Sequence, residues 1–187
     1  MPKTEETADV IAVLTHDHRE FEELFLKVQD HARFGKRRKE LADQITIELI
    51  RHSVAEEQYV YPLVRIAPGG RDLVDGALAQ NAEAESLMKE LEPLQPTDDA
   101  FDVVLGRLIT ATRAHIAGEE AELFPSLART CLPMEMRALG EKVQAAKSIA
   151  PTRPHPSAPH TPPGNLLVAP ALGLIDRIRD ALAHRGP

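Results

Sequence analysis

Apolar residues recur along most of the chain at intervals of three and four, the spacing of an amphipathic helix with one buried face. The pattern predicts four long helices and a short one, at residues 8–31, 36–66, 71–92, 99–129 and 134–148. The connections contain Gly, Pro and Asp residues, which end one helix or cap the next, as in "APGG" and "PLQPTDD". No strand pattern competes with the helical one. We therefore predict an all-α fold, an up-down-up-down four-helix bundle with a short fifth helix.

The pattern changes after residue 148. The stretch "PTRPHPSAPHTPPGNLLVAP" at 151–170 contains seven prolines, which favour an extended polyproline conformation over packed structure. Helical spacing returns at 171–185, with Asp and Arg opposite an apolar stripe of Leu172, Ile175, Ile178 and Leu182. We expect a bundle of residues 1–148 and a tail of residues 149–187, made of a Pro-rich linker and an amphipathic helix. That helix needs a partner surface, in cis or on another subunit.

The bundle and the tail also differ in charge. Residues 1–148 hold 18 basic and 27 acidic residues, a net charge of −9, whereas residues 149–187 hold four Arg and two acids, a net charge of +2. The total of −7 argues against a nucleic-acid surface, and the lack of a long apolar run argues against a membrane span. The acidic N-terminus does not resemble a secretory signal, and the single Cys131 cannot form an intramolecular disulfide. We expect a cytoplasmic protein.

Polar residues interrupt the apolar stripe of each long helix. Each stripe contains a His or Asn with a Glu four residues later, in the pairs His18/Glu22, His52/Glu56, Asn81/Glu85 and His115/Glu119. Residues four apart differ by only about 40° around a helix, so both side chains of a pair can converge on one point. The first pair is the weakest because Glu22 borders its stripe. Unpaired buried charges are costly, so either mutual His–Glu pairing or a metal must neutralise them.

Two of these pairs lie in a repeated motif, "HSVAEEQYVYP" at 52–62 and "HIAGEEAELFP" at 115–125. Three imidazoles with two or three carboxylates suit a dinuclear non-haem iron site better than structural zinc, which often uses thiolates. We expect the second glutamates, Glu57 and Glu120, to face solvent, and Tyr61 to pack in the core. The prolines that close the motif are expected to end or kink their helices. His155 and His160 are expected in a solvated linker.

The segments "DHREFEELF", "HSVAEEQYVYP" and "HIAGEEAELFP" resemble the three His-bearing segments of the bacterial hemerythrin-like (HHE cation-binding) proteins. The stretch "APTRPHPSAPHTPPGN" is similar to a tail of actinobacterial members. The resemblance implies a four-helix bundle and two iron ions with oxo or carboxylate bridges. The implied ligands are His18, His52, Glu56, His115 and Glu119, with Glu56 and Glu119 placed to bridge the ions.

One position departs from the family pattern. The third helix of these proteins normally opens its motif with His, whereas this chain has Asn81. An amide is a poorer iron donor than an imidazole, so one ion loses a nitrogen ligand, and Glu85 is the candidate substitute. Alternatively, that position is weak or empty and the site binds a single ion.

The resemblance implies a protein that binds, senses or detoxifies a small oxidant: O₂, NO or peroxide. A peroxide- or NO-consuming activity is one version of this function, and reversible binding is the other. The alternative is a helical scaffold or interaction protein with an incomplete or single-metal site, whose tail recruits a partner. Asn81 is the residue that favours this alternative.

Overall fold

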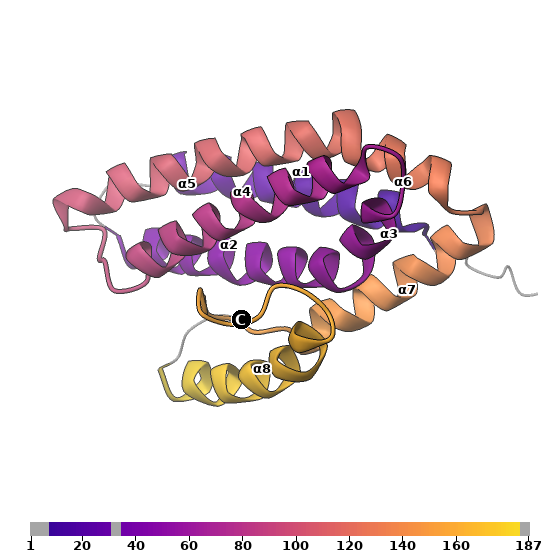
Figure 1. Cartoon of the computed structure of the whole chain (residues 1–187). Coiled ribbons are helices and arrows are strands. Elements are labelled where there is room, and N and C mark those ends of the chain that lie inside the picture. Colours follow the sequence, from indigo (N-terminus) through magenta and orange to yellow (C-terminus); the bar gives the residue numbers. More distant parts are fainter. Residues whose placement is uncertain (1–7, 31–34, 184–187) are drawn as a thin grey trace, which may run out of the picture.

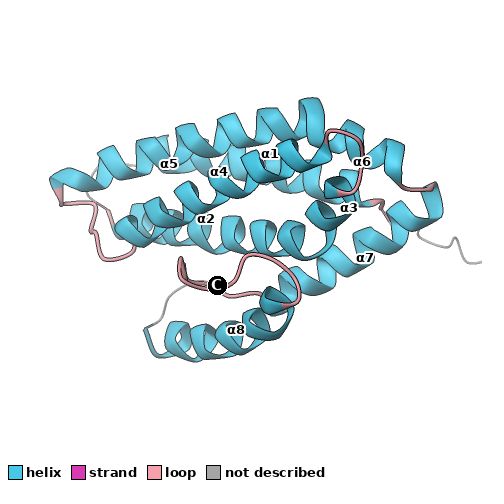
Figure 2. Ribbon diagram, viewed as in Figure 1, coloured by secondary structure: helices cyan, strands magenta, loops and turns pink. Residues whose placement is uncertain are grey.

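The structure, a computed structural model, describes residues 8–30 and 35–183. The ends of the helices predicted at 8–31 and 171–185, and the N-terminal segment judged not to be a secretory signal, lie partly or wholly outside these residues. Every regular element in the described part is a helix (Figure 2), which confirms the all-α prediction. None of the described helices is long and apolar enough to cross a bilayer.

Four long helices lie side by side and form the bundle (Figure 1). They are α1 (Val10–Asp30), α2 (Lys36–Ala55), α4 (Gly70–Leu91) and α5 (Asp99–Gly118). Consecutive helices among these four run in opposite directions, as predicted (Figure 1). Gly69, which has a left-handed backbone with φ of 75°, makes the turn into α4 possible.

Helices α2 and α5 do not end where their α-geometry ends. Each continues through five residues of π-helix and a further short α-helix. The π-helices are η1 (Glu56–Val60) and η2 (Glu119–Leu123), and the short helices are α3 (Tyr61–Arg65) and α6 (Phe124–Thr130). Helix α7 (Pro133–Ile149) follows and packs along α1 and α2.

The aliphatic core forms two separate clusters along the bundle. One cluster is built from the C-terminal part of α1, α2, the C-terminal part of α4 and most of α5, and includes Phe25 and Leu108. The other is built from the start of α1, the start of α4 and helices α3, α6 and α7, and includes Leu14 and Leu127. On each long helix the inward His or Asn lies between the residues of the two clusters. The predicted polar positions therefore occupy a layer with apolar packing on both sides.

The tail folds back on the bundle. After α7 the chain runs along the bundle without regular structure and then forms α8 (Gly164–Ala183), which lies outside the α2 side of the bundle (Figure 1). Gly173 permits close contact between α8 and the end of α7, because a Cβ there would stand 2.3 Å from the carbonyl oxygen of Ile149. The helix begins earlier than predicted and contains Pro170.

The apolar stripe of α8 mostly faces away from the bundle, so the bundle is not the partner surface for most of this stripe. Asp176 and Asp180 are buried, whereas Ile175, Ile178 and Leu182 are exposed. The acidic side of the helix faces the polypeptide because the tail segment supplies donors to it. The backbone N–H groups of Thr152 and Arg153 donate to Asp176, and the Arg153 guanidinium donates to Asp180.

Candidate metal centre

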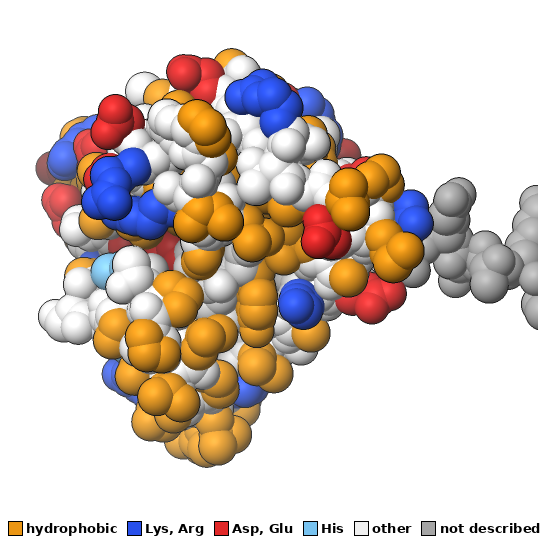
Figure 3. Space-filling model, turned by 45° about the vertical axis from the view of Figure 1, so that its right-hand side comes forward, with side chains coloured by type: hydrophobic (Ala, Val, Ile, Leu, Met, Phe, Trp, Pro, Cys, Tyr) orange, Lys and Arg blue, Asp and Glu red, His pale blue; other side chains and the backbone are white. Residues whose placement is uncertain are grey.

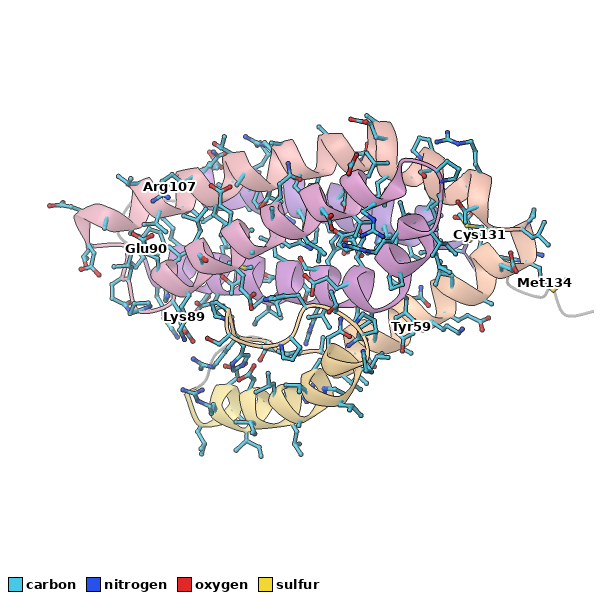
Figure 4. All side chains as sticks on the ribbon, in the orientation of Figure 1. Tyr59, Lys89, Glu90, Arg107, Cys131 and Met134 are labelled. Atoms are coloured by element: carbon cyan, nitrogen blue, oxygen red, sulfur yellow. The ribbon has the colours of Figure 1, made fainter. Side chains whose placement is uncertain are left out.

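Three imidazoles and two carboxylates meet in the polar layer of the bundle. His18 lies in α1, His52 and His115 lie in the last turns of α2 and α5, and Glu56 and Glu119 begin η1 and η2. All five side chains are buried. The Nε2 atoms of His18 and His115 lie 3.4 and 3.3 Å from the two oxygens of Glu119, and His52 Nε2 lies 3.3 Å from Glu56. In Figure 4, nitrogen- and oxygen-bearing side chains are gathered inside the bundle at this level.

Five of the atoms that face one another have no hydrogen-bond partner. They are Nε2 of His18, His52 and His115, Oε1 of Glu56 and Oε2 of Glu119. Buried polar atoms are nearly always satisfied in folded proteins, so a group of five in one place requires an explanation. A cation between them would satisfy the set. Single ligand atoms of His18, His52, Glu56 and Glu119 lie within 4.8 Å of one another, a spacing that one ion can span. The donor set therefore fits a metal ion with nitrogen and oxygen ligands.

The other ring nitrogen of each imidazole has a hydrogen-bond acceptor on a different helix. Nδ1 of His52 lies 3.0 Å from Asp17, Nδ1 of His18 lies 2.9 Å from Glu120, and Nδ1 of His115 lies 3.0 Å from the Gln80 oxygen. A proton held on Nδ1 leaves the Nε2 lone pair directed into the cluster. This is the arrangement that orients imidazoles in metal sites.

Electrostatics within the cluster are strong. Burial alone would lower the pKa of His52, but the nearby carboxylate of Glu56, the hydrogen bond with Asp17 and the nearby carboxylate of Glu119 outweigh burial and hold that pKa well above its usual value. Burial raises the pKa of Glu119, yet its contacts with His115 and the other imidazoles bring it well below the usual value. Without a metal, His52 is therefore held in its protonated form, and metal binding has to displace a proton.

The π-helices set the direction of the two glutamates. The Tyr61 N–H donates to the Glu56 carbonyl and the Phe124 N–H donates to the Glu119 carbonyl, both across five residues. Such a turn contains one more residue than an α-turn, and π-turns are frequent at functional sites. Pro62 and Pro125 follow. They were expected to end or kink their helices, and of these two outcomes the structure excludes an end. They take the second positions of α3 and α6, where the missing N–H group interrupts α-helical bonding.

Tyr61 contributes more than core packing. Its hydroxyl donates to Glu119 at 2.9 Å and also lies 3.2 Å from Glu56, so it contacts both carboxylates of the cluster. Burial, followed by the charges of Glu119 and Glu56, holds the Tyr61 pKa well above its usual value, so the hydroxyl stays a donor. Tyr59 lies nearer the surface (Figure 4) and is only partly buried against the second apolar cluster.

This arrangement places the chain among known proteins. The model of the hemerythrin HHE cation-binding domain matches residues 9–127, which covers all four long helices and the whole cluster. The chain belongs to the hemerythrin HHE cation-binding family.

Two relatives and one solved structure extend the comparison. An uncharacterised hemerythrin-like protein of Schizosaccharomyces pombe is 26% identical over 142 residues, 75% of this chain and 70% of that protein. A protein named DNA nickase from Nostoc sp. is 25% identical over 136 residues, 73% of this chain but only 38% of that protein. The crystal structure of an HHE domain-containing protein from Mycobacterium kansasii shares the fold, with a TM-score of 0.67 and 22% identity over 75% of this chain and 86% of that chain.

The departure from the family pattern at Asn81 has a visible consequence. Asn81 is buried, and its amide nitrogen lies 3.2 Å from the Tyr61 hydroxyl and 3.4 Å from Glu57. Glu57 is buried, contrary to the expectation that it faces solvent. The structure does not bring the candidate substitute ligand, Glu85, into the cluster of three imidazoles and two carboxylates, which we call the HHE cluster. Its carboxylate accepts from the backbone N–H of His155 and lies 3.6 Å from His160 Nε2. The Asn81 amide therefore faces the Tyr61 hydroxyl and the Glu57 carboxylate.

Sequence reasoning missed the residues that orient the imidazoles. Asp17 and Gln80 were not singled out, and Glu120 was expected to face solvent. Each lies next in sequence to an inward residue and makes a hydrogen bond with an imidazole. Adjacent helical residues differ by about 100°, which points them at the neighbouring helix. Glu22, which borders its stripe, is instead exposed and paired with Arg113.

The tail covers the bundle next to the cluster instead of forming a solvated linker. His160 lies between two glutamates, with Nδ1 3.3 Å from Glu57 and Nε2 3.6 Å from Glu85, and His155 pairs with Asp176. The bond with Glu57 raises the pKa of His160 to about 9. A cavity of about 40 Å³ remains beneath the tail, with Asn81 among its lining residues.

Proposed function

We propose that the HHE cluster holds iron and that the protein binds, senses or detoxifies a small oxidant, namely O₂, NO or peroxide. The observation that carries the proposal is the set of five unpartnered buried atoms facing one another, with each imidazole held from behind at Nδ1. Two carboxylates and three imidazoles suit non-haem iron, which supplies redox chemistry and an open coordination position when bound.

The contributions of the chain itself are definite. His18 and His52 with Glu56 and Glu119 form the compact part of the site, where one ion fits. His115 contacts the other oxygen of Glu119 and would help to hold a second ion. The apolar clusters on both sides exclude water and restrict entry to small molecules. Tyr61 places a hydroxyl proton beside both carboxylates.

The test is the iron content of the purified chain, measured by elemental analysis. His52→Ala and His115→Ala should each reduce iron per chain, because each removes an imidazole that faces the cluster. His16→Ala is the matched control, since His16 is exposed on α1 and pairs with Glu20 on the same helix. Unchanged iron in both cluster variants would overturn the ligand assignment.

A single-metal scaffold is the second candidate, and Asn81 is the observation that favours it. The Asn81 amide stands where the family places an imidazole. It faces the Tyr61 hydroxyl and the Glu57 carboxylate, and Glu85 is hydrogen-bonded to the tail. Asn81→His should raise iron per chain if the second position is weak for lack of this ligand. No rise would mean that the second position is already filled or that the site is mononuclear, and the wild-type iron-to-chain ratio separates these two cases.

A further experiment separates binding from turnover. Reversible spectral change of the iron form on adding and removing O₂ or NO would support a carrier or sensor. Steady consumption of peroxide or NO would support an enzyme. Neither response from an iron-loaded protein would favour the scaffold.

A further inference from the structure

Helix α8 has two faces of opposite character, and the tail holds the acidic one against the protein. Asp176 and Asp180 are buried, and they accept hydrogen bonds from Thr152 and Arg153. Arg153 also pairs with Glu92 of the bundle at 2.6 Å. These contacts fix the rotation of α8 about its own axis. The apolar side of the helix is consequently turned outward.

The outward side carries a continuous set of apolar side chains, which we call the α8 ridge: Leu167, Ala171, Leu174, Ile175, Ile178 and Leu182. The five large ones are each between 51% and 79% exposed. At 100° per residue all six fall within a sector of about 100° around the helix. Figure 3 shows apolar side chains gathered over this part of the molecule. A monomer seldom leaves an apolar patch of several hundred Å² uncovered unless another surface binds it.

We propose that the α8 ridge binds the same ridge of a second copy of this chain, with the two helices antiparallel. The ridge is self-complementary in that orientation. If the two-fold axis passes between Leu174 and Ile175, Leu174 of one copy lies opposite Ile175 of the other. Ala171 then lies opposite Ile178, and Leu167 lies opposite Leu182. Every ridge residue thus meets an apolar residue, as an isologous two-fold interface requires.

The spacing of the ridge also suits a partner that is itself a helix. The intervals between Leu167, Ala171, Leu174 and Ile178 are four, three and four residues, the spacing of a coiled-coil seam. Helix α8 is 20 residues long, or about 30 Å. That length allows both ridges to be covered from end to end by one antiparallel pair.

The charges beside the ridge favour antiparallel over parallel pairing. Asp176 and Asp180 are buried against Thr152 and Arg153, so they present no charge to a partner surface. Arg177 donates to the Ala150 carbonyl, and Arg179 is exposed beside the ridge. Antiparallel pairing places Arg179 opposite Pro170, about 14 Å along the axis from the other Arg179, whereas parallel pairing would bring the two cations together.

The first test is the mass of the full chain in solution, measured by size-exclusion chromatography with light scattering over a micromolar dilution series. We expect wild type at twice the 20.6 kDa chain mass, and Leu174→Glu and Ile178→Glu as monomers. Both positions are exposed within the chain, so circular dichroism and iron content should match wild type. The control is Met134→Glu, which changes an exposed apolar residue at the N-terminal end of α7, away from α8 (Figure 4). This variant should remain dimeric.

The second test fixes the orientation with cysteines in a Cys131→Ser background, using diamide as the oxidant. Leu174→Cys should cross-link to its own copy. Neither Leu167→Cys nor Leu182→Cys should cross-link by itself. A mixture of the two variants should cross-link, position 167 of one copy to position 182 of the other. Self-cross-linking of Leu182→Cys would indicate parallel helices and overturn the proposed geometry. A wild-type monomer across the dilution series would overturn the pairing, as would a monomer that cosediments with anionic phospholipid vesicles. The cluster stays inside each copy, so these outcomes are independent of iron.

Discussion

At the residue scale, the centre depends on the hydrogen bond that each imidazole makes at Nδ1, on the side away from the cluster. Asp17 is the most deeply buried of the carboxylates that make these bonds, and it accepts from both His52 Nδ1 at 3.0 Å and Lys147 Nζ at 2.5 Å. Burial raises the pKa of Asp17, but the bonds to His52 and Lys147 outweigh it and lower the pKa below its usual value. Asp17 is therefore a carboxylate that holds the Nδ1 proton of His52, which leaves Nε2 as the atom that would bind a metal.

We predict that Asp17→Asn weakens metal binding roughly 10- to 100-fold, the usual effect of removing such a partner, while the helices remain formed. The amide keeps the shape of the side chain but loses the charge that holds His52. Competition against a chelator measures the affinity. Glu20→Gln is the control, since Glu20 is an exposed acid on the same helix. Equal affinities in Asp17→Asn and wild type would show that His52 does not need this support.

At the element scale, the distinctive features are the two π-helices and the tail. The apolar spacing predicted the long helices because burial of one face determines where they form. It did not predict the π-helices, because a one-residue insertion in a helix leaves the spacing on each side intact. The repeated "EE" and the proline after each aromatic residue were the visible signs of these turns.

The polarity of α8 could not be predicted from its own sequence. Its apolar stripe was correctly placed on one side, but which side faces the protein depends on donors 20 to 30 residues earlier, such as Arg153 and His155. Likewise, the positions of His18, His52, Glu56, His115 and Glu119 followed from helical spacing. Their supports on neighbouring helices depend on packing, which spacing does not encode.

The tail should detach more easily at alkaline pH. The bond with Glu57 raises the pKa of His160 from 6.5 to about 9. A raised pKa in the folded state contributes stability that is fully present below pH 6.5 and is lost as the pH rises through about 9. We predict that the difference in unfolding free energy between wild type and His160→Gln shrinks between these values, measured by urea unfolding. His16→Gln should follow the wild-type profile. A difference that does not change with pH would contradict the proposed imidazolium contact.

At the scale of the whole molecule, the apolar clusters enclose a centre that is unfavourable without its cation. The pKa of Glu56 is raised by burial and then by the nearby charge of Glu119, which reflects the cost of holding two carboxylates there. An ion bound by all five ligands would remove that cost and link the α1, α2 and α5 segments. The centre should therefore act as a cross-link within the bundle.

We predict that iron removal lowers thermal stability. Binding only to the folded state stabilises it by about 2.7 kcal/mol at a free ligand concentration of 100 Kd. For a chain of this size that corresponds to a fall in Tm of roughly 5–10 °C on chelation. Differential scanning calorimetry of the iron-loaded and chelated protein measures it. His52→Ala should show a much smaller difference, and an equal difference in that variant would place the stabilising ion elsewhere.

The most direct test of the central claim is an anomalous difference map, at the iron edge, from crystals of the iron-loaded protein. We predict a peak between Nε2 of His18, Nε2 of His52 and the carboxylates of Glu56 and Glu119, with any second peak beside His115. A map with no peak among these side chains, and with their atoms hydrogen-bonded directly to one another, would contradict the metal assignment.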